Sequence, residues 1–308
     1  MNIFTLVLIV AGLSLFETIS SIDNAIINAE VLSTMKPKSQ RWFLIWGMLF
    51  AVFVVRGFLP WLIVWLSTPG LSPWGAVTAA FSSDPNVHAA IERSAPLLLL
   101  AGAVFLILLF FHWLFLETKN YGLIGEKFFQ SQGVWFYAVA SVLLALIVWL
   151  ALRVNPYMGF AAVIGSTAFF ITHGFKENAA KQEQKLLKGG LSDVSKILYL
   201  EILDTTFSID GVLGAFAFTL SVPLILIGNS LGAFVVREFT VHNVKRIKKY
   251  IFLKNGAMYS ILFLGIIMLM DSFGYHIPPW LSPVVTFAIT GYFYFKSIKA
   301  TTALEKTL

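Results

Sequence analysis

Long apolar segments separated by short polar ones run through the whole chain. A helix of about 20 apolar residues is long enough to cross the hydrocarbon core of a bilayer. Segments near this length recur from end to end and predict an all-α fold, a polytopic transmembrane helix bundle of about nine helices. We expect these helices at residues 3–30, 42–66, 96–117, 134–153, 157–175, 197–220, 222–243, 251–274 and 280–298.

The composition favours the same environment. Of the 308 residues, 58% are hydrophobic and 12% are charged, whereas soluble domains carry about 25% charged residues. The chain contains no cysteine, which excludes disulfides and cysteine-ligated zinc. We find no nucleotide-binding loop, no plausible Ser-His-Asp set and no His-Glu-x-x-His helix, so we do not expect an enzyme.

The net charge of +6 is unevenly distributed. Lysine and arginine concentrate in residues 31–41, 118–133, 176–196, 237–254 and the C-terminal tail, whereas the opposite connections hold only Arg93 and Arg153. Loops rich in lysine and arginine lie on the cytoplasmic side of a membrane. We therefore expect a multi-pass protein of the cell (plasma or inner) membrane, with its N-terminus outside and its C-terminus in the cytoplasm. Nucleic acid is not an expected partner.

One polar motif occurs twice inside the apolar segments. Residues 17–25 read Glu-Thr-Ile-Ser-Ser-Ile-Asp-Asn-Ala, and residues 204–212 read Asp-Thr-Thr-Phe-Ser-Ile-Asp-Gly-Val. In each copy a carboxylate stands six residues before the aspartate of a Ser-Ile-Asp triplet. A charged residue at bilayer depth costs about 2.5–3.5 kcal/mol on insertion scales, so a functional acidic site is favoured over a packing role.

Further similarities indicate an inverted repeat. Residues 47–56 resemble residues 228–237, and a Gly-Ala pair opens a later apolar segment in each half, at residues 102–103 and 256–257. Five helices separate the two starts, so the halves cross the membrane in opposite senses, which is typical of transporters. We divide the chain into residues 1–118 (repeat 1, three helices), 119–196 (two connecting helices and a linker), 197–275 (repeat 2) and 276–308 (last helix and tail).

The aspartate of each triplet does not fit a continuous helix. Glu17, Ser21, Asn24 and Asn28 share one helical face, whereas Asp23 lies roughly 120° away from it. In the second copy Asp210 is displaced from its motif in the same way. We therefore predict that both helices are interrupted at Ser-Ile-Asp, which would turn the aspartates into the site. The alternative is that Asp23 and Asp210 form ion pairs with Arg56 and Arg237.

The polar atoms in both motifs are carboxylate, amide and hydroxyl oxygens. Such hard ligands suit magnesium, calcium and manganese rather than copper or zinc. His112 and His173, near helix ends, are either accessory ligands, proton carriers or hydrogen-bonded structural residues. Chance similarity between apolar helices explains the Gly-Ala pairs better than it explains the repeated acids.

The motifs resemble those of the TerC family of integral membrane proteins, and of its DUF475 branch in particular. The similarity is carried by residues 17–25, 200–216 and 254–259 and extends over nearly the whole chain. It implies a fold shared with LysE-type exporters, and manganese export or tellurium resistance in some relatives. The family's intramembrane acids correspond here to Glu17, Asp23, Glu201, Asp204 and Asp210, with Asn24 beside them. Gly211 stands where Asn24 would recur, which makes the site asymmetric.

The leading hypothesis is a transporter that exports a divalent metal cation, Mn²⁺ before Ca²⁺ or Mg²⁺, in exchange for protons. Its expected metal ligands are Glu17, Asp23, Asn24, Glu201, Asp204 and Asp210. One alternative is a non-transporting membrane scaffold, linked to metal or tellurium stress, in which the acids form structural ion pairs. Another is an exporter of a small organic cation. The lipid bilayer is the expected partner, and a homo-oligomer is compatible with the sequence.

Overall fold

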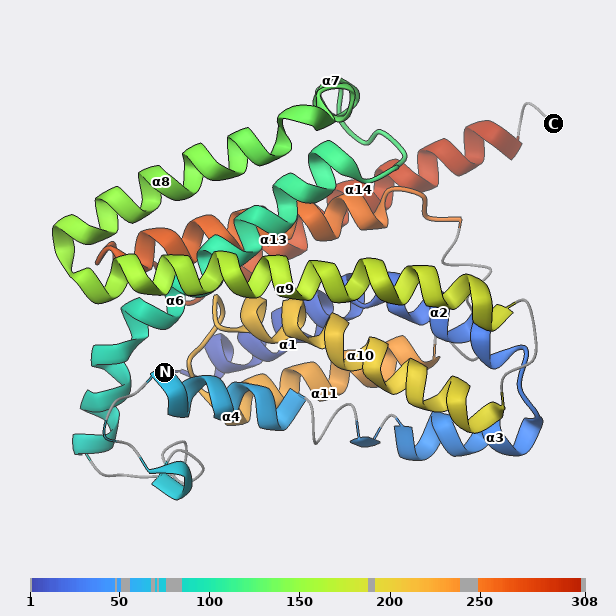
Figure 1. The fold of residues 1–308 in the computed structure, drawn as a ribbon, viewed down its shortest axis with the longest axis horizontal. Helices are drawn as coiled ribbons and strands as arrows, with labels where there is room; N and C mark the ends of the chain where they lie inside the picture. Colours follow the sequence, from blue (N-terminus) through green and yellow to red (C-terminus); the bar gives the residue numbers. More distant parts are fainter. Residues whose placement is uncertain are drawn as a thin grey trace.

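The computed structural model describes residues 2–47, 49–50, 56–67, 70, 72–75, 85–187, 192–238 and 249–305. These residues form helices and connections, with no strand among them (Figure 1). The elements are α1 (Ile3–Ser20), α2 (Ile22–Leu32), α3 (Pro37–Trp42), a π-helical turn (Phe43–Gly47), α4 (Arg56–Ser67), α6 (Pro85–Leu116), α7 (Glu126–Ser131), a 3₁₀ turn (Gly133–Trp135), α8 (Phe136–Val154), α9 (Pro156–Leu187), α10 (Asp193–Ala215), α11 (Val222–Glu238), α13 (Leu253–Ser272) and α14 (Leu281–Glu305).

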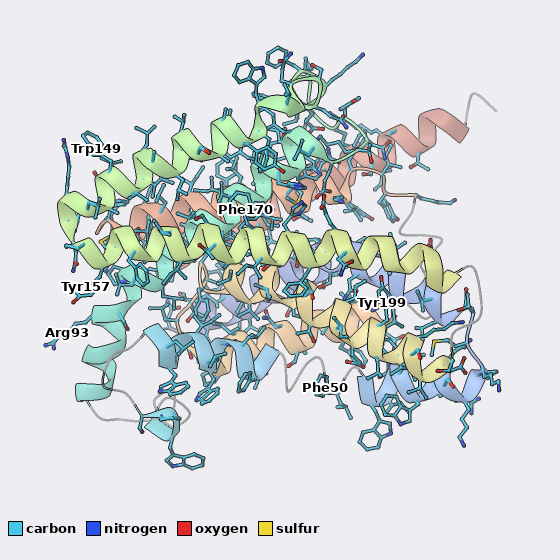
Figure 2. The ribbon with its side chains drawn as sticks, viewed as in Figure 1. Phe50, Arg93, Trp149, Tyr157, Phe170 and Tyr199 are labelled. Atoms are coloured by element: carbon cyan, nitrogen blue, oxygen red, sulfur yellow. The ribbon has the colours of Figure 1, made fainter. Side chains whose placement is uncertain are left out.

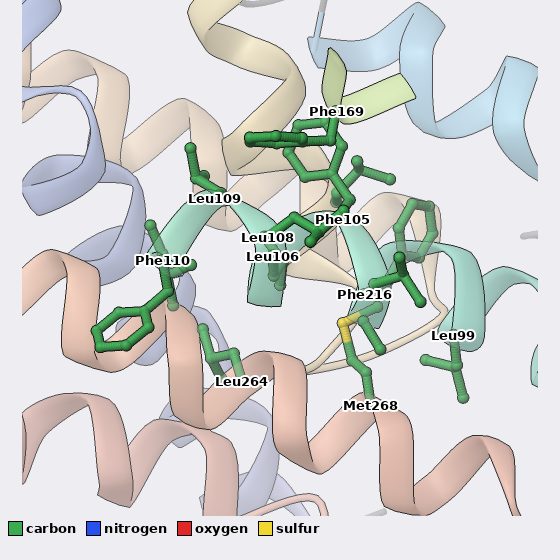
Figure 3. Packing of buried hydrophobic residues seen from close by; sticks show 14 of the residues in the cluster. Leu99, Phe105, Leu106, Leu108, Leu109, Phe110, Phe169, Phe216, Leu264 and Met268 are labelled. Carbon is green, nitrogen blue, oxygen red and sulfur yellow. The ribbon is translucent and has the colours of Figure 1, made fainter. Parts of the chain in front are cut away.

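Helix α6 forms the centre of the bundle, because its second half is apolar on every side and must be covered all round. It packs against α13 and α9, while α8 covers α9 and α14 covers α13. Phe105 and Leu106 of α6 are fully buried. Leu106 lies toward Leu264 of α13, whereas Phe105 packs edge-on against Phe169 of α9 (Figure 3). Helix α1 packs mainly against α11 and α14 and completes the other side of the bundle.

The outer faces of the bundle are apolar and match a membrane. Large exposed side chains such as Trp149 and Tyr157 point outwards from α8 and α9 (Figure 2), and soluble proteins rarely expose such surface over whole helices. Helical segments long and apolar enough to span a bilayer are Ile3–Ser20, Arg93–Leu116, Gly133–Val154, Pro156–Asn178 and Leu253–Ser272. The prediction of an all-α, multi-pass membrane bundle is confirmed.

Several helix ends differ from the prediction. Helix α6 begins at Pro85 and α9 continues to Leu187, so part of each expected loop is helical. Both helices start with a proline, which has no N–H to leave unpaired in a first turn. The helix expected at residues 42–66 appears as the π-helical turn and α4, and residues 48 and 51–55 between them lie outside the described residues.

The connection after α2 is fixed to the start of α10. The Asp193 carboxylate accepts hydrogen bonds from Ser39 Oγ at 2.7 Å and from the Lys36 N–H at 3.2 Å. The bond from Ser39 is the main reason why the pKa of Asp193 lies below its ordinary value. Lys196 Nζ donates to Thr34 Oγ1 at 2.9 Å. These contacts hold α2 beside α10, the two helices that carry the acidic motifs.

Candidate functional site

The first motif contains a break between two helices. Helix α1 ends at Ser20, Ser21 leaves the helical region with φ −93° and ψ 3°, and α2 begins at Ile22. Ser21 Oγ donates a hydrogen bond to Glu17 Oε1 at 2.8 Å, so the residue at the break also orients the motif acid. The predicted interruption at Ser-Ile-Asp is confirmed in this copy.

The second motif contains no such break, and the prediction of one there is wrong. Helix α10 runs without interruption from Asp193 to Ala215 and includes Ser208, Ile209 and Asp210. Ser208 Oγ donates to the Asp204 carbonyl at 2.7 Å, within the helix. Lys176 of α9 binds the Asp210 carboxylate, so this aspartate has a counter-charge without any turn in the backbone.

The Glu17 side chain lies buried between two glycines from different helices. A Cβ atom on Gly211 of α10 would lie 2.7 Å from Glu17 Oε2, and one on Gly232 of α11 would lie 2.6 Å from Glu17 Cβ. Ser14, one turn earlier on α1, donates to the Gly228 carbonyl at 3.0 Å. Small residues let helices approach closely in a membrane. Here they leave the room that Glu17 occupies.

The two motifs meet where α2 and α10 run side by side in opposite directions (Figure 1). The Asn24 side-chain amide donates to the Asp204 carboxylate, and both residues are buried. In the repeat, Glu17 corresponds to Asp204 and Asn24 to Gly211. Each motif acid therefore contacts the residue that follows Ser-Ile-Asp in the other motif. Asp204 contacts Asn24, and Glu17 contacts Gly211.

Further acceptor oxygens lie near the contact of α1–α2 with α10, which we call the crossing. Among the described residues, the buried atoms Asn24 Oδ1, Asn28 Oδ1 and Glu201 Oε1 have no hydrogen-bond donor. Glu201 lies over Gly47, where a Cβ atom would come within 2.2 Å of its Oε1. The Asn24–Asp204 contact sets an antiparallel register that brings Asn28 and Glu201 to the same level of the two helices. The crossing is thus rich in oxygens that lack a positive partner.

Of the other predicted site residues, Asp210 lies away from the Asn24–Asp204 contact, and the Asp23 side chain is outside the described part of the structure. Among the described residues Asp210 bonds with Lys176, away from the Asn24–Asp204 contact. The side chains of Asp23 and Arg56 lie outside the described part of the structure. Arg237 is half-buried near the end of α11 and forms no ion pair with a described side chain. The cation that pairs with Asp210 is therefore Lys176, from the lysine-rich segment 176–196, and not Arg237.

Within the described residues, no three histidine, aspartate or glutamate side chains cluster closely enough to hold a metal ion. The described carboxylates do not by themselves form a metal centre, so a cation at this crossing would also need neutral oxygens or water. His112 and His173 pair with each other, with their ring centroids 3.8 Å apart.

A family model described as "Protein of unknown function (DUF475)" matches residues 22–303. The chain belongs to the DUF475 family. The matched region begins directly after the break at Ser21, so it includes α2 and α10 and leaves out Glu17. The predicted resemblance to DUF475 is confirmed. No curated protein and no solved structure matches the chain.

Proposed function

We propose that this DUF475 protein is a membrane transporter that exports a divalent metal cation through the crossing of α1–α2 with α10. The observation that carries the proposal is the reciprocal contact of the two motifs, Glu17 with Gly211 and Asp204 with Asn24. The two motif acids stand at equivalent positions of two opposed segments inside an apolar bundle, and each contacts a residue of the other motif, at a cost that a purely structural role does not require.

The helix contacts support an inverted repeat. If α1–α2 corresponds to α10, α4 to α11 and α6 to α13, exchanging the halves should preserve the contacts. The pair α1–α11 has its counterpart in α10–α4, the pair α1–α13 in α10–α6, and α6 packs directly on α13. Transporters with such repeats bind their substrates where the repeats meet, which is where Glu17 and Asp204 lie.

The oxygen chemistry supports a hard cation as substrate. Leaving a buried acceptor unsatisfied costs about 1–3 kcal/mol, and a bound cation would satisfy Asn24 Oδ1, Asn28 Oδ1 and Glu201 Oε1 together. Ions such as Mg²⁺ are held by one or two carboxylates with water and neutral oxygens completing the shell. This fits a site with few clustered acids. We place Mn²⁺ before Ca²⁺ and Mg²⁺ because of the resemblance to TerC proteins and LysE-type exporters.

We propose export because of the same resemblance, and the proposed orientation defines which side of the membrane is cytoplasmic. The excess of lysine and arginine in residues 118–133 and 237–254 favours a cytoplasmic position for these segments, with the N-terminus outside. Acids that release a cation take up protons readily when they repel one another, so we include cation–proton exchange in the proposal. One observation favours the scaffold alternative, namely that Asp210 forms an ion pair with Lys176.

The test is metal flux in proteoliposomes. The wild-type protein should move Mn²⁺, and Glu17→Gln and Asp204→Asn should each reduce the flux by about 10- to 100-fold, the range seen when metal-site support is removed. Glu30→Gln, an exposed position at the end of α2, is the matched control and should retain the flux. Each variant is first checked for a monodisperse, folded state in detergent.

Two results would overturn the proposal. One is a folded wild-type protein that moves none of Mn²⁺, Ca²⁺ and Mg²⁺, which would favour the scaffold. The other is full flux in the folded Glu17→Gln/Asp204→Asn double variant, which would place the transport path elsewhere in the bundle.

A further inference from the structure

Two histidine side chains in contact, His112 of α6 and His173 of α9, lie outside the acidic crossing. The ring centroids of His112 and His173 are 3.8 Å apart, and the ring planes meet at 52°. Phe136 packs edge-on against His112, and Phe169 stacks on His173. His112 is 7% exposed, and its Nδ1 has no hydrogen-bond partner among the described residues. A buried ring nitrogen without a partner can still accept a proton.

Carboxylates stand at both ends of the pair and lead to the surface. Glu117 Oε1 lies 3.6 Å from His112 Nδ1, and Glu177 Oε1 lies 3.6 Å from His173 Nε2. The side chains of Glu117 and Glu177 are 33% and 63% exposed. Lys254 of α13 binds Glu117 at 2.8 Å. Each imidazole therefore faces a carboxylate that is partly exposed at the surface of the protein.

The same pair connects to the helix that carries the second acidic motif. Lys176 lies one turn after His173 on the same side of α9, and it binds Asp210 of α10. Asp204 is on that same helix, six residues before Asp210. The charged groups that act on His173 are Glu117 at the end of α6 and Lys176 and Glu177 on α9. Lys254 on α13 binds Glu117, and Asp210 on α10 binds Lys176.

Two imidazoles in contact cannot both carry a positive charge at modest cost, because like charges at this distance raise the free energy of the doubly charged state. Histidine is also the side chain that changes charge close to neutral pH. The pair of His112 and His173 is therefore suited to hold one proton and not two.

We propose that His112 and His173 form a binding site for a single exchangeable proton, the one that the transporter exchanges for its cation. This coupling rests on the proposed function. To release the proton, an imidazolium N–H gives it to the Glu117 or Glu177 carboxylate, which passes it to water and becomes anionic again. While the pair is charged, it repels the Lys176 ammonium and weakens its bond to Asp210. Binding of the proton thereby changes the strength of the contact between α9 and Asp210 of α10.

The first experiment does not depend on transport. Purified protein with isotopically labelled histidine is titrated by NMR in detergent from about pH 8 to about pH 5, the range in which histidine changes charge. The pair should take up one proton in total, and His112→Gln and His173→Gln should each change the titration of the remaining ring. His276→Gln, at an exposed loop position, is the control. Two rings that titrate independently, each unchanged in the other's variant, would overturn the inference.

The second experiment measures coupling. In proteoliposomes with a trapped pH indicator, the His112→Gln/His173→Gln variant should still move Mn²⁺ down its gradient, while the accompanying proton flux falls by at least about tenfold. His276→Gln should keep the wild-type ratio of protons to cations, and an unchanged ratio in the double variant would overturn the coupling. If the wild-type protein moves no cation, the proposed function and the coupling both fail, and the titration alone decides whether the pair binds one shared proton.

Discussion

The two copies of the motif share a Ser-Ile-Asp triplet with an acid six residues before its aspartate, but they have different backbones. In the first copy the helix stops at Ser21 and restarts at Ile22, whereas in the second α10 continues through Ser208 and Asp210 to Ala215. Both copies contribute an acid to the same crossing, Glu17 from the broken segment and Asp204 from the straight one. The backbone of the motif is therefore not determined by the motif alone.

The difference lies in what the neighbouring helices supply. Asp210 receives a counter-charge from Lys176 of α9, a helix between the two proposed repeats, and α10 stays straight. After the triplet, the first copy offers the amide of Asn24 to Asp204, while the second has Gly211, which leaves room for Glu17. The backbones of the two similar segments therefore differ because the elements around them differ.

Removing the counter-charge should produce the largest effect. The Lys176–Asp210 ion pair is partly buried, with side chains 17% and 13% exposed, and breaking a fully buried pair from one side costs about 3–5 kcal/mol. Lys176→Met should therefore destabilise the protein by up to about this amount or alter α10. The Lys176→Met/Asp210→Asn double variant should recover most of the loss, because no uncompensated charge remains. Thermal unfolding in detergent measures both. Lys38→Met, at an exposed position on α3, is the control, and a Lys176→Met protein as stable as this control would contradict our explanation of the straight helix.

The sequence showed that the aspartate of each triplet does not fit the polar face of a continuous helix, but it did not show how the structure resolves this conflict. The helical period places Asp23 and Asp210 away from the polar face of their helices, and either a break or a separate partner resolves that conflict. The choice depends on Lys176, which is 34 residues from Asp210 in the chain. Apolar periodicity does not say which helices become neighbours, so this contact was not predictable. The contact of Asn24 with Asp204 agrees with the predicted pairing of the two motifs.

The fold was more predictable than the site, because the length of an apolar segment alone indicates a spanning helix. Helices α8, α11 and α13 lie within a few residues of their predicted positions. The ends were less predictable where polar residues continue a helix beyond the membrane. Residues 176–187 have the mixed charges of a loop and still extend α9, because lysine, glutamate, glutamine and alanine all favour helix.

Proline at the middle residue of each triplet should destabilise the protein to different extents in the two copies. Ile209→Pro lies inside α10, where proline removes a hydrogen bond and clashes with the preceding turn, at a cost of about 3 kcal/mol or more. Ile22→Pro falls on the first residue of α2, a position where proline is tolerated, and Ser21 before it has already left the helical region. Thermal unfolding of the two variants should show a much larger loss for Ile209→Pro. Equal losses of stability in the two variants would contradict the break at Ser21.

The smallest effect concerns the serines of the two triplets. Ser21 Oγ donates to the buried Glu17 carboxyl group at 2.8 Å, and losing a hydrogen bond to such a group costs about 1.5–3 kcal/mol if the group is charged and about 1 kcal/mol if it is neutral. Ser208 Oγ donates to a carbonyl of its own helix, a bond that slightly destabilises helices, and alanine is the better helix former. Ser21→Ala should therefore lower the unfolding temperature and the Mn²⁺ flux, while Ser208→Ala changes neither or raises the unfolding temperature slightly. The reverse order would mean that α10, and not the break in α1–α2, is the segment whose local hydrogen bonds hold the crossing together.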